Sequence, residues 1–206
     1  MVVTHIVPIT NSRSKVYIDN EFAFVLYKGE LRNYKITEGK EISDSLIEEV
    51  VTTVLCKRAK VRGMLLLKKR PYTEKQMHDK LKQGFYPEGV IEVAIDYFKS
   101  FGYIDDYQYA TDYIEYYSEG KSRKRLEQDL ITKGIDKSLI KSALTKWQEE
   151  GGIIDEVAQI RDLLRKKAYD PEHCNIHEKQ KVMAFLFRKG FDISIIKKVL
   201  NYEEIF

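Results

Sequence analysis

The sequence predicts a mainly α-helical protein in which three tandem three-helix repeats follow a small N-terminal β-hairpin region. Apolar residues recur at helical spacing through most of the chain, and the same spacing pattern returns three times. Residues 1–42 differ, because they contain one alternating run and one apolar, aromatic run that are both typical of strands. Stacked helical repeats bury each other's apolar faces, so we expect an elongated or curved body.

The N-terminal region contains two runs that are typical of strands. KVYID, residues 15–19, alternates and is rich in β-formers, and FAFVLYKGEL, residues 22–31, is a second apolar and aromatic run. Asn20 and Glu21 lie between the two runs and can turn the chain. The two runs therefore predict a hairpin or strand pair.

Three later segments share one apolar pattern that runs through two helices and the turn between them. The turn contains Gly134 in the second segment and Gly190 in the third, whereas Gly84 of the first segment lies one position out of register. We therefore expect the first turn to differ slightly from the other two. The equivalent apolar residues are Met77, Leu126 and Val182; Leu81, Leu130 and Leu186; Ile91, Ile140 and Ile196; and Ile95, Leu144 and Leu200.

The second helix of each segment starts at an equivalent position, which holds Pro87, Asp136 or Asp192. Proline suits the first turn of a helix and aspartate suits its cap. A leading helix precedes the first repeat and begins near Ser43 or Asp44, which can both act as caps. The repeat helices are expected near residues 55–70, 73–84 and 87–101; 106–118, 122–133 and 136–149; and 153–168, 177–189 and 192–203. The resulting divisions of the chain are residues 1–42, 43–102, 103–151 and 152–206.

Asp105 and Asp106 are adjacent carboxylates, and such a pair can act in acid–base catalysis or bind a metal ion. However, FGYIDD at the end of the first repeat is echoed by GGIIDE at the end of the second. Gly102 and Gly152 can each end a helix in the left-handed conformation, and Asp105 and Asp155 can each cap the next helix. The pair is therefore interpreted as structural.

The composition is that of a soluble, folded protein. Of the 206 residues, 43% are hydrophobic and 33% are charged, and no apolar run is long enough for a membrane-spanning helix. The N-terminus lacks the basic start and long apolar run of a secretory signal. The cysteines, Cys56 and Cys174, are therefore expected to be free thiols in a reducing cytoplasm.

No motif indicates catalysis or a cofactor. His173, Cys174 and His177 offer three possible metal ligands within five residues, but no second pair completes a tetrahedral site. The 11 glycines are scattered rather than gathered in a phosphate-binding loop, and there is no G-x-S-x-G nucleophile motif. We expect no enzymatic activity, no cofactor and no metal.

The formal net charge is only +3, but basic residues gather in three clusters. Such clusters are either solvated helix faces or a surface for a polyanionic partner. The second cluster opens a helix, where positive charge is unfavourable, so we hypothesise that it faces a negatively charged partner. The clusters are Lys57, Arg58, Lys60, Arg62, Lys68, Lys69 and Arg70; Lys121, Arg123, Lys124 and Arg125; and Arg165, Lys166 and Lys167.

Tyrosines crowd into the first helix of the second repeat. Tyr109, Tyr113, Tyr116 and Tyr117 share one broad face of that helix. They form either a core stripe with hydroxyl groups at its wet edge or a partner surface, since tyrosine favours interfaces and can stack on bases.

Several segments, in a specific order and spacing, together resemble the RecX family of bacterial regulatory proteins. The resemblance runs from about Lys15 onward and is to the longer form found in Gram-positive bacteria. Asp129 departs from the family pattern, because glutamate is common at that position. The segments are KVYIDNEFAF, KKRPYTEKQMHDKLKQGF, FGYIDDYQYATDYI and GKSRKRLEQDLITKGI.

The resemblance implies a fold of three tandem three-helix repeats and a role in regulating the RecA recombinase. Family members bind the RecA filament on single-stranded DNA and modulate, mostly by inhibition, recombination, ATP hydrolysis and the repressor cleavage of the SOS response. We therefore expect a monomeric protein that meets DNA directly or through RecA, and no membrane partner. Two alternatives stay open: a helical protein that binds single-stranded nucleic acid independently of RecA, and a protein-only helical adaptor.

Overall fold

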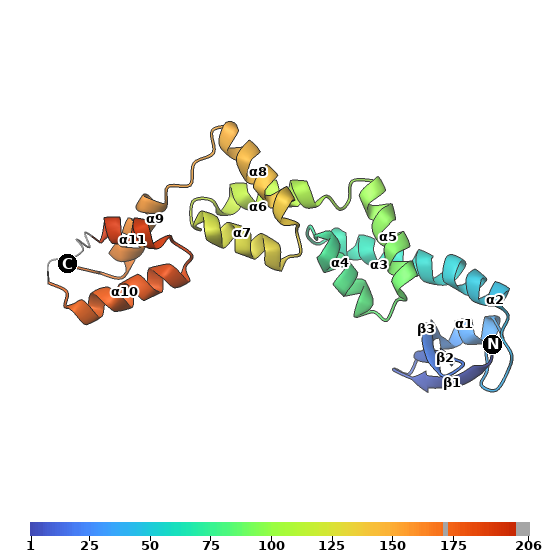
Figure 1. Cartoon of the computed structure of the whole chain (residues 1–206). Coiled ribbons are helices and arrows are strands. Elements are labelled where there is room, and N and C mark those ends of the chain that lie inside the picture. Colours follow the sequence, from blue (N-terminus) through green and yellow to red (C-terminus); the bar gives the residue numbers. More distant parts are fainter. Residues whose placement is uncertain (171–172, 201–206) are drawn as a thin grey trace. The chain divides into compact units, whose positions relative to one another are not determined.

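The computed structural model of the chain describes residues 1–170 and 173–200. The chain divides into two compact units, Met1–Asp105 and Asp106–Phe206 (Figure 1). The first unit contains a small sheet and the first helical repeat, and the second unit contains the other two repeats. The mainly helical class with a small N-terminal sheet is therefore confirmed.

The sheet has three antiparallel strands in the order β1-β2-β3, whereas the sequence predicted two strands. Its strands are β1 (Val3–Pro8), β2 (Arg13–Ile18) and β3 (Glu21–Tyr27). The β2–β3 turn lies at Asp19 and Asn20, which have φ values of 49° and 70°. Positive φ at both positions is typical of a type I′ two-residue hairpin turn, so the turn falls one residue earlier than predicted. The extra strand β1 was missed because its apolar alternation is weak.

The second predicted strand run ends earlier than its sequence suggests. Residues Lys28–Asn33 form helix α1 instead of continuing the strand. The Glu30 carboxylate accepts a hydrogen bond from the backbone N–H of Tyr27 at 2.7 Å, which helps to start this helix. The short helix places Glu30 beside the long helix that follows.

The leading helix begins as predicted, with the Ser43 hydroxyl accepting the backbone N–H of Leu46 at 3.2 Å. Helix α2 (Asp44–Glu49) continues through a π-helical segment, Val50–Leu55, into α3 (Cys56–Leu67). The leading helix and the first repeat helix are thus one continuous helical stretch.

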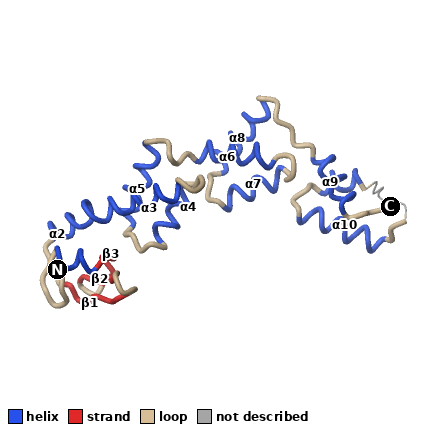
Figure 2. Tube along the Cα trace, turned by 180° about the vertical axis from the view of Figure 1, so that it is seen from behind, coloured by secondary structure: helices blue, strands red, loops and turns tan. Residues whose placement is uncertain are grey.

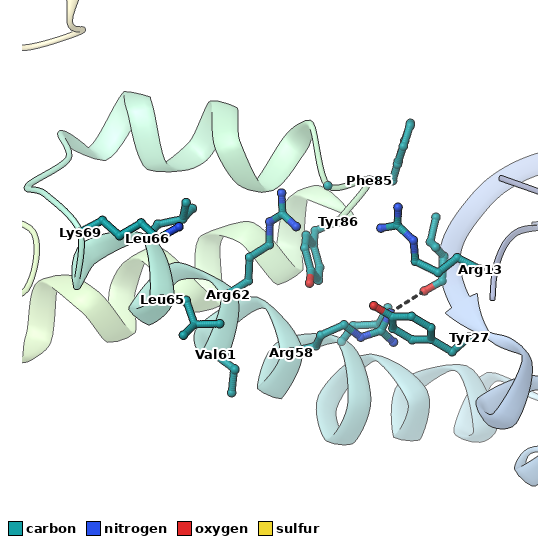
Figure 3. A pocket seen from close by; sticks show the side chains of 13 residues that line it. Arg13, Tyr27, Arg58, Val61, Arg62, Leu65, Leu66, Lys69, Phe85 and Tyr86 are labelled. Carbon is teal, nitrogen blue, oxygen red and sulfur yellow. Dashed lines mark hydrogen bonds between the residues drawn. The ribbon is translucent and has the colours of Figure 1, made fainter. Parts of the chain in front are cut away.

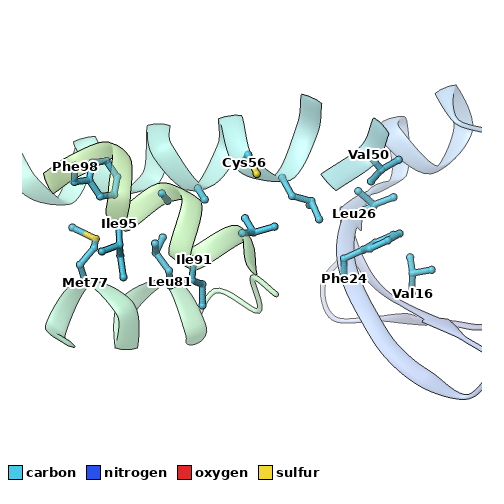
Figure 4. Close-up of a cluster of buried hydrophobic side chains, with 14 of the residues drawn as sticks. Val16, Phe24, Leu26, Val50, Cys56, Met77, Leu81, Ile91, Ile95 and Phe98 are labelled. Carbon is cyan, nitrogen blue, oxygen red and sulfur yellow. The ribbon is translucent and has the colours of Figure 1, made fainter. Parts of the chain in front are cut away.

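One hydrophobic core joins the sheet to the first repeat. Phe24 and Leu26 of β3 are buried and lie opposite Val50 in Figure 4. The same cluster of buried side chains continues through Met77 and Leu81 into the helices of the repeat. These helices are α4 (Glu74–Lys82) and α5 (Glu88–Ser100).

The second unit holds two more three-helix repeats, each with its own cluster of buried apolar residues. Figure 2 shows these helices in blue and the described loops between them in tan. In residues 1–170 and 173–200, none of the helices combines the length and apolarity that crossing a membrane requires. The helices are α6 (Asp106–Tyr117), α7 (Arg123–Thr132), α8 (Lys137–Glu149), α9 (Glu156–Lys166), α10 (Ile176–Arg188) and α11 (Ile193–Val199).

The repeats match one another at their buried positions. Leu81, Leu130 and Leu186 are each 0% exposed, as equivalent core residues should be. Val182 differs from its equivalents Met77 and Leu126, because it is only partly buried at the edge of the third cluster.

The three repeat turns share one backbone conformation, although their residues differ. Gly134 and Gly190 have φ values of 91° and 92°, and Phe85 takes the same place in the first repeat with a φ of 63°. Phe85 therefore occupies the left-handed position that Gly84 misses by one residue. The expected difference lies in the residue type rather than in the turn.

The predicted starts of the second helices are found as expected. The carboxylates of Asp136 and Asp192 accept the backbone N–H groups of Ser138 and Ser194, each at 2.8 Å. Pro87 holds the same N-cap position before α5 without a side-chain bond. An identical local device therefore starts the last helix of the second and third repeats.

The connections after the first and second repeats resemble each other, as predicted, but not at every residue. The Asp155 carboxylate accepts a backbone N–H in the first turn of α9 at 2.9 Å, and Asp105 directly precedes α6. Gly102 has a left-handed φ of 67°, as predicted. In the second joint it is Gly151, with a φ of 97°, and not Gly152, because Gly151 directly follows the cap of α8.

Replacing Leu81, Leu130 or Leu186 with alanine should lower the free energy of unfolding of the unit that holds it by about 2–5 kcal/mol, because each change leaves a cavity. Urea denaturation of each variant measures this loss. Leu65→Ala is a matched control, since Leu65 is 60% exposed and its loss should cost at most about 0.5 kcal/mol. A core variant as stable as the control would show that the three positions are not equivalent.

Candidate nucleic-acid interface

The first basic cluster lies on α3 and the turn after it, and part of it is tied to the fold. Arg58 forms an ion pair with Glu30 of α1 at 2.9 Å. The Nζ atom of Lys60 lies 4.6 Å from the ring centroid of Tyr97. The other members are exposed to solvent: Lys57, Arg62, Lys68, Lys69 and Arg70.

A groove of about 400 Å³ in the first unit brings together cations from two distant parts of the chain. Arg13 reaches it from β2, whereas Arg58, Arg62 and Lys69 reach it from α3 and the residues just after it. Figure 3 shows Arg13 and Arg62 extending toward the turn between α4 and α5. The aromatic side chains of the groove are Tyr27, Phe85 and Tyr86. We call this site the arginine groove.

The arginine groove carries concentrated positive charge. No carboxylate lines it, and Glu30 neutralises only Arg58. Within the described part of the chain, Arg13, Arg62 and Lys69 have no ion-pair partner. Cations held close together beside apolar walls attract phosphate or carboxylate groups more strongly than scattered surface cations do.

Tyr86 forms an apolar wall of the groove beside two guanidinium groups. Burial raises the pKa of its hydroxyl, while the nearby charges of Arg58 and Arg62 act in the opposite direction. The hydroxyl therefore stays protonated at neutral pH and can donate a hydrogen bond to an anion.

The second basic cluster is largely neutralised by carboxylates of its own repeat. Lys121 and Arg125 contact the two oxygens of Asp129 at 2.7 and 3.0 Å. Arg123 pairs with Glu127 at 3.1 Å. Three of the four cations thus have a partner inside the fold.

The N-terminus of α7 also receives negative charge from the next repeat. The carboxylate of Glu156 in α9 accepts the backbone N–H of Arg123 at 2.9 Å. The charge argument for an external partner at this helix therefore does not hold, because the chain supplies the missing carboxylates. Lys124 and Arg125 are the exposed members, and the Nζ atom of Lys124 lies 5.6 Å from the ring centroid of Phe187. Partner binding by this cluster stays a prediction.

Asp129 is the centre of this ion-pair network. Its carboxylate accepts hydrogen bonds from Lys121 at 2.7 Å and from the Tyr113 hydroxyl at 3.0 Å. Burial alone would raise the pKa of Asp129, but the hydrogen bonds from Lys121 and Tyr113 together with the charges of Lys121 and Arg125 lower it.

The third basic cluster is exposed to solvent, and two of its three members contact neighbouring side chains. Arg165 pairs with Asp162 at 3.2 Å, and the Nζ atom of Lys167 lies 4.3 Å from the ring centroid of Phe185. Lys166 is exposed. None of these residues lines the arginine groove, which lies in the other unit.

The tyrosines of α6 divide between the two interpretations. Tyr109 and Tyr113 pack against the core of the second repeat, as a core stripe would. Tyr113 also contacts Tyr117 nearer the end of the helix, with ring centroids 4.5 Å apart. Tyr116 is 78% exposed and leaves an aromatic surface at the end of the helix.

The stretch with three possible metal ligands, residues 173–177, makes the side-chain contacts of an ordinary loop. His173 lies 2.7 Å from the Asp170 carboxylate, and the Cys174 thiol lies 3.1 Å from the Tyr169 hydroxyl. In the described ranges, which leave out residues 171–172, no three potential ligands are grouped to hold a metal ion.

Sequence reasoning found part of the arginine groove but missed Arg13, Tyr27, Phe85 and Tyr86. These residues come from the sheet and from the turn between α4 and α5, and only the folded unit brings them to α3. The displaced glycine beside Phe85 was the one available signal, because it marked an unusual residue in the turn.

Comparison with known families identifies the helical repeats one by one. The models described as RecX, first, second and third three-helix domain match residues 59–98, 105–144 and 154–200. Each match covers one three-helix repeat of the structure. The matched residues together make up more than half of the chain.

Relatives of the whole chain carry the same family name. The chain is 33% identical to the regulatory protein RecX of Caldanaerobacter subterraneus subsp. tengcongensis, over 93% of each chain. It is 27% identical to the regulatory protein RecX of Bacillus subtilis, over 93% of this chain and 72% of that one.

Two crystal structures share the fold. A regulatory protein RecX, 25% identical, superimposes over 98% of this chain and 99% of its own with a TM-score of 0.62. RecX from Lactobacillus salivarius, 22% identical, matches the fold over 71% of this chain and 95% of its own with a TM-score of 0.57.

Asp129→Asn should remove an acid-sensitive part of the stability of the second unit. Because the pKa of Asp129 is lowered on folding, its contribution is present above the ordinary aspartate pKa of 3.8 and is lost as the pH falls through the lower folded value. Urea denaturation between pH 7 and pH 2 should show wild type and variant converging at the acid end. Exposed Asp96→Asn is the control, and a constant gap between wild type and Asp129→Asn at every pH would refute the network.

Proposed function

This chain belongs to the RecX family of regulatory proteins, and from that premise we infer that it regulates the RecA recombinase. It binds the filament that RecA forms on single-stranded DNA. Binding modulates, and mostly inhibits, recombination, ATP hydrolysis by RecA and the co-protease activity of the SOS response. The protein would thereby act in DNA repair and DNA recombination within the cytoplasm.

The arginine groove is the observation that best supports a filament as the partner. A nucleoprotein filament presents a regular array of phosphates and protein carboxylates, and cations without internal partners suit such a polyanion. Arg13, Arg62 and Lys69 have this property within the described residues, whereas most of the second cluster is neutralised. The groove is therefore the first candidate for the filament contact.

The proposed action is regulation by binding rather than by catalysis. The contacts described above neutralise charges, start helices and join repeats, and the family name itself denotes a regulator. We propose that a monomer binds the filament without a cofactor, so that inhibition scales with the fraction of filament sites it occupies.

Two other functions of a different class make distinct predictions. A protein that binds single-stranded nucleic acid independently of RecA would bind bare DNA as tightly as the filament, with a steep salt dependence. A protein-only adaptor would bind RecA without such a dependence. Co-sedimentation with RecA, with and without DNA, at several salt concentrations separates these possibilities from the proposed function.

Arg62→Ala combined with Lys69→Ala should weaken binding to RecA filaments and flatten its salt dependence. If both side chains meet phosphates, the slope of log K against log salt should fall by about 1 for each lost contact. Both residues are exposed, so the thermal unfolding midpoint should stay near that of the wild type. Titration of wild type and variant against filaments at several salt concentrations measures both effects.

Arg123→Ala combined with Arg125→Ala is the matched comparison, because it also removes two cations. These arginines pair with Glu127 and Asp129, so we expect lower stability but an unchanged salt slope. The opposite result would be a shallower salt slope for Arg123→Ala with Arg125→Ala and a wild-type slope for Arg62→Ala with Lys69→Ala. It would show that the second cluster, and not the groove, contacts the filament.

A further inference from the structure

The turn between α4 and α5 is built like its two counterparts. The backbone N–H of Tyr86 donates to the carbonyl of Leu81 at 3.4 Å. The same bond joins Ile135 to Leu130 at 3.2 Å in the second repeat, and an equivalent bond closes the turn of the third. The fold therefore requires the same backbone conformation in all three turns.

Only the first turn places a large side chain at its left-handed position. Glycine occupies that position in the other two repeats, at Gly134 and Gly190, because it has no Cβ to clash there. Phe85 adopts a φ of 63°, which is unfavourable for a bulky residue. The turn does not require a phenylalanine, so the side chain has a use outside the turn.

The Phe85 ring stands at the rim of the arginine groove. It is 36% exposed, and it lines the groove together with Arg13, Arg62 and Tyr86. The Nζ atom of Lys15 lies 4.6 Å from the centroid of the ring, which adds a further cation to this side of the groove. A half-exposed ring with a lysine beside it, in a groove that also holds arginines, is the combination with which single-strand-binding proteins hold nucleic acids.

We propose that the arginine groove binds one short segment of single-stranded nucleic acid, with a base stacked on Phe85 and neighbouring phosphates on Arg13 and Arg62. This proposal rests on the proposed function, for which it names a direct contact between this chain and the strand.

The lining of the groove favours an unpaired strand over other anions. In a duplex the bases are stacked on each other and none is free to stack on Phe85, whereas an unpaired strand offers such a base to the groove. An acidic peptide would satisfy the guanidinium groups but would gain nothing from an aromatic ring in a strained turn. The position of Phe85 is therefore best explained by a partner with flat aromatic groups.

The test is direct binding of the full chain to a fluorescein-labelled oligothymidylate, measured by anisotropy in the absence of RecA. Phe85→Gly should weaken binding by about 5- to 100-fold, the range expected for the loss of one base-stacking contact. The same variant should keep or raise the thermal unfolding midpoint, because glycine suits the left-handed turn. Phe85→Tyr should bind within about threefold of the wild type, since it restores a stacking ring.

A structural role for Phe85, such as seating Lys15 of the sheet, predicts a different pattern. Phe85→Leu keeps an apolar side chain at the turn but offers no ring, so it should fold like the wild type and bind as weakly as Phe85→Gly. Phe101→Ala is the control for a surface phenylalanine, since Phe101 is 62% exposed in the same unit and does not line the groove. It should bind like the wild type.

Three results would overturn the proposal. The first is an absence of oligothymidylate binding by the wild type, which would leave filament binding through RecA intact. The second is wild-type affinity in Phe85→Leu, which would show that no ring is needed. The third is equal displacement of the oligonucleotide by a polyglutamate of the same charge, which would make the groove a site for any polyanion.

Discussion

Each of the three repeats depends on closing two short helices across a tight left-handed turn. Neither helix of such a pair is long enough to be stable alone, and the turn brings them together so that Leu81, Leu130 or Leu186 is buried completely. In the second and third repeats, the helix after the turn starts directly behind its cap, Asp136 or Asp192. In the first repeat the same turn also sets the rim of the arginine groove, because Phe85 occupies its left-handed position.

Internal carboxylates decide which of the many cations are available to a partner. The start of α7 is neutralised by Asp129, Glu127 and Glu156. The second basic cluster therefore contributes to the stability of the second unit and to the joint between its repeats. Around the arginine groove Glu30 engages only Arg58. The distribution of acids, rather than the number of basic residues, therefore separates structural cations from candidate binding cations.

The repeats could be predicted from the sequence because their signals are local. Helical spacing and caps such as Asp136 act within a few residues. The turn glycines Gly134 and Gly190 stand at equivalent positions of the repeated pattern. The arginine groove could not be predicted, because Arg13 and Phe85 are brought to α3 by packing of the sheet, which no local pattern encodes. The charge at the start of α7 could not be judged from local sequence either, because Glu156, distant in the sequence, supplies a carboxylate there; partner binding by the second cluster stays a prediction.

The most direct test of this account is amide hydrogen exchange of the protein, alone and bound to RecA filaments on single-stranded DNA. The account predicts that bound filament slows exchange in peptides covering the exposed end of α3 and the turn at Phe85, since both border the groove. Peptides at the start of α7 should exchange equally in both states. Protection confined to α7, with no change around the groove, would contradict the account.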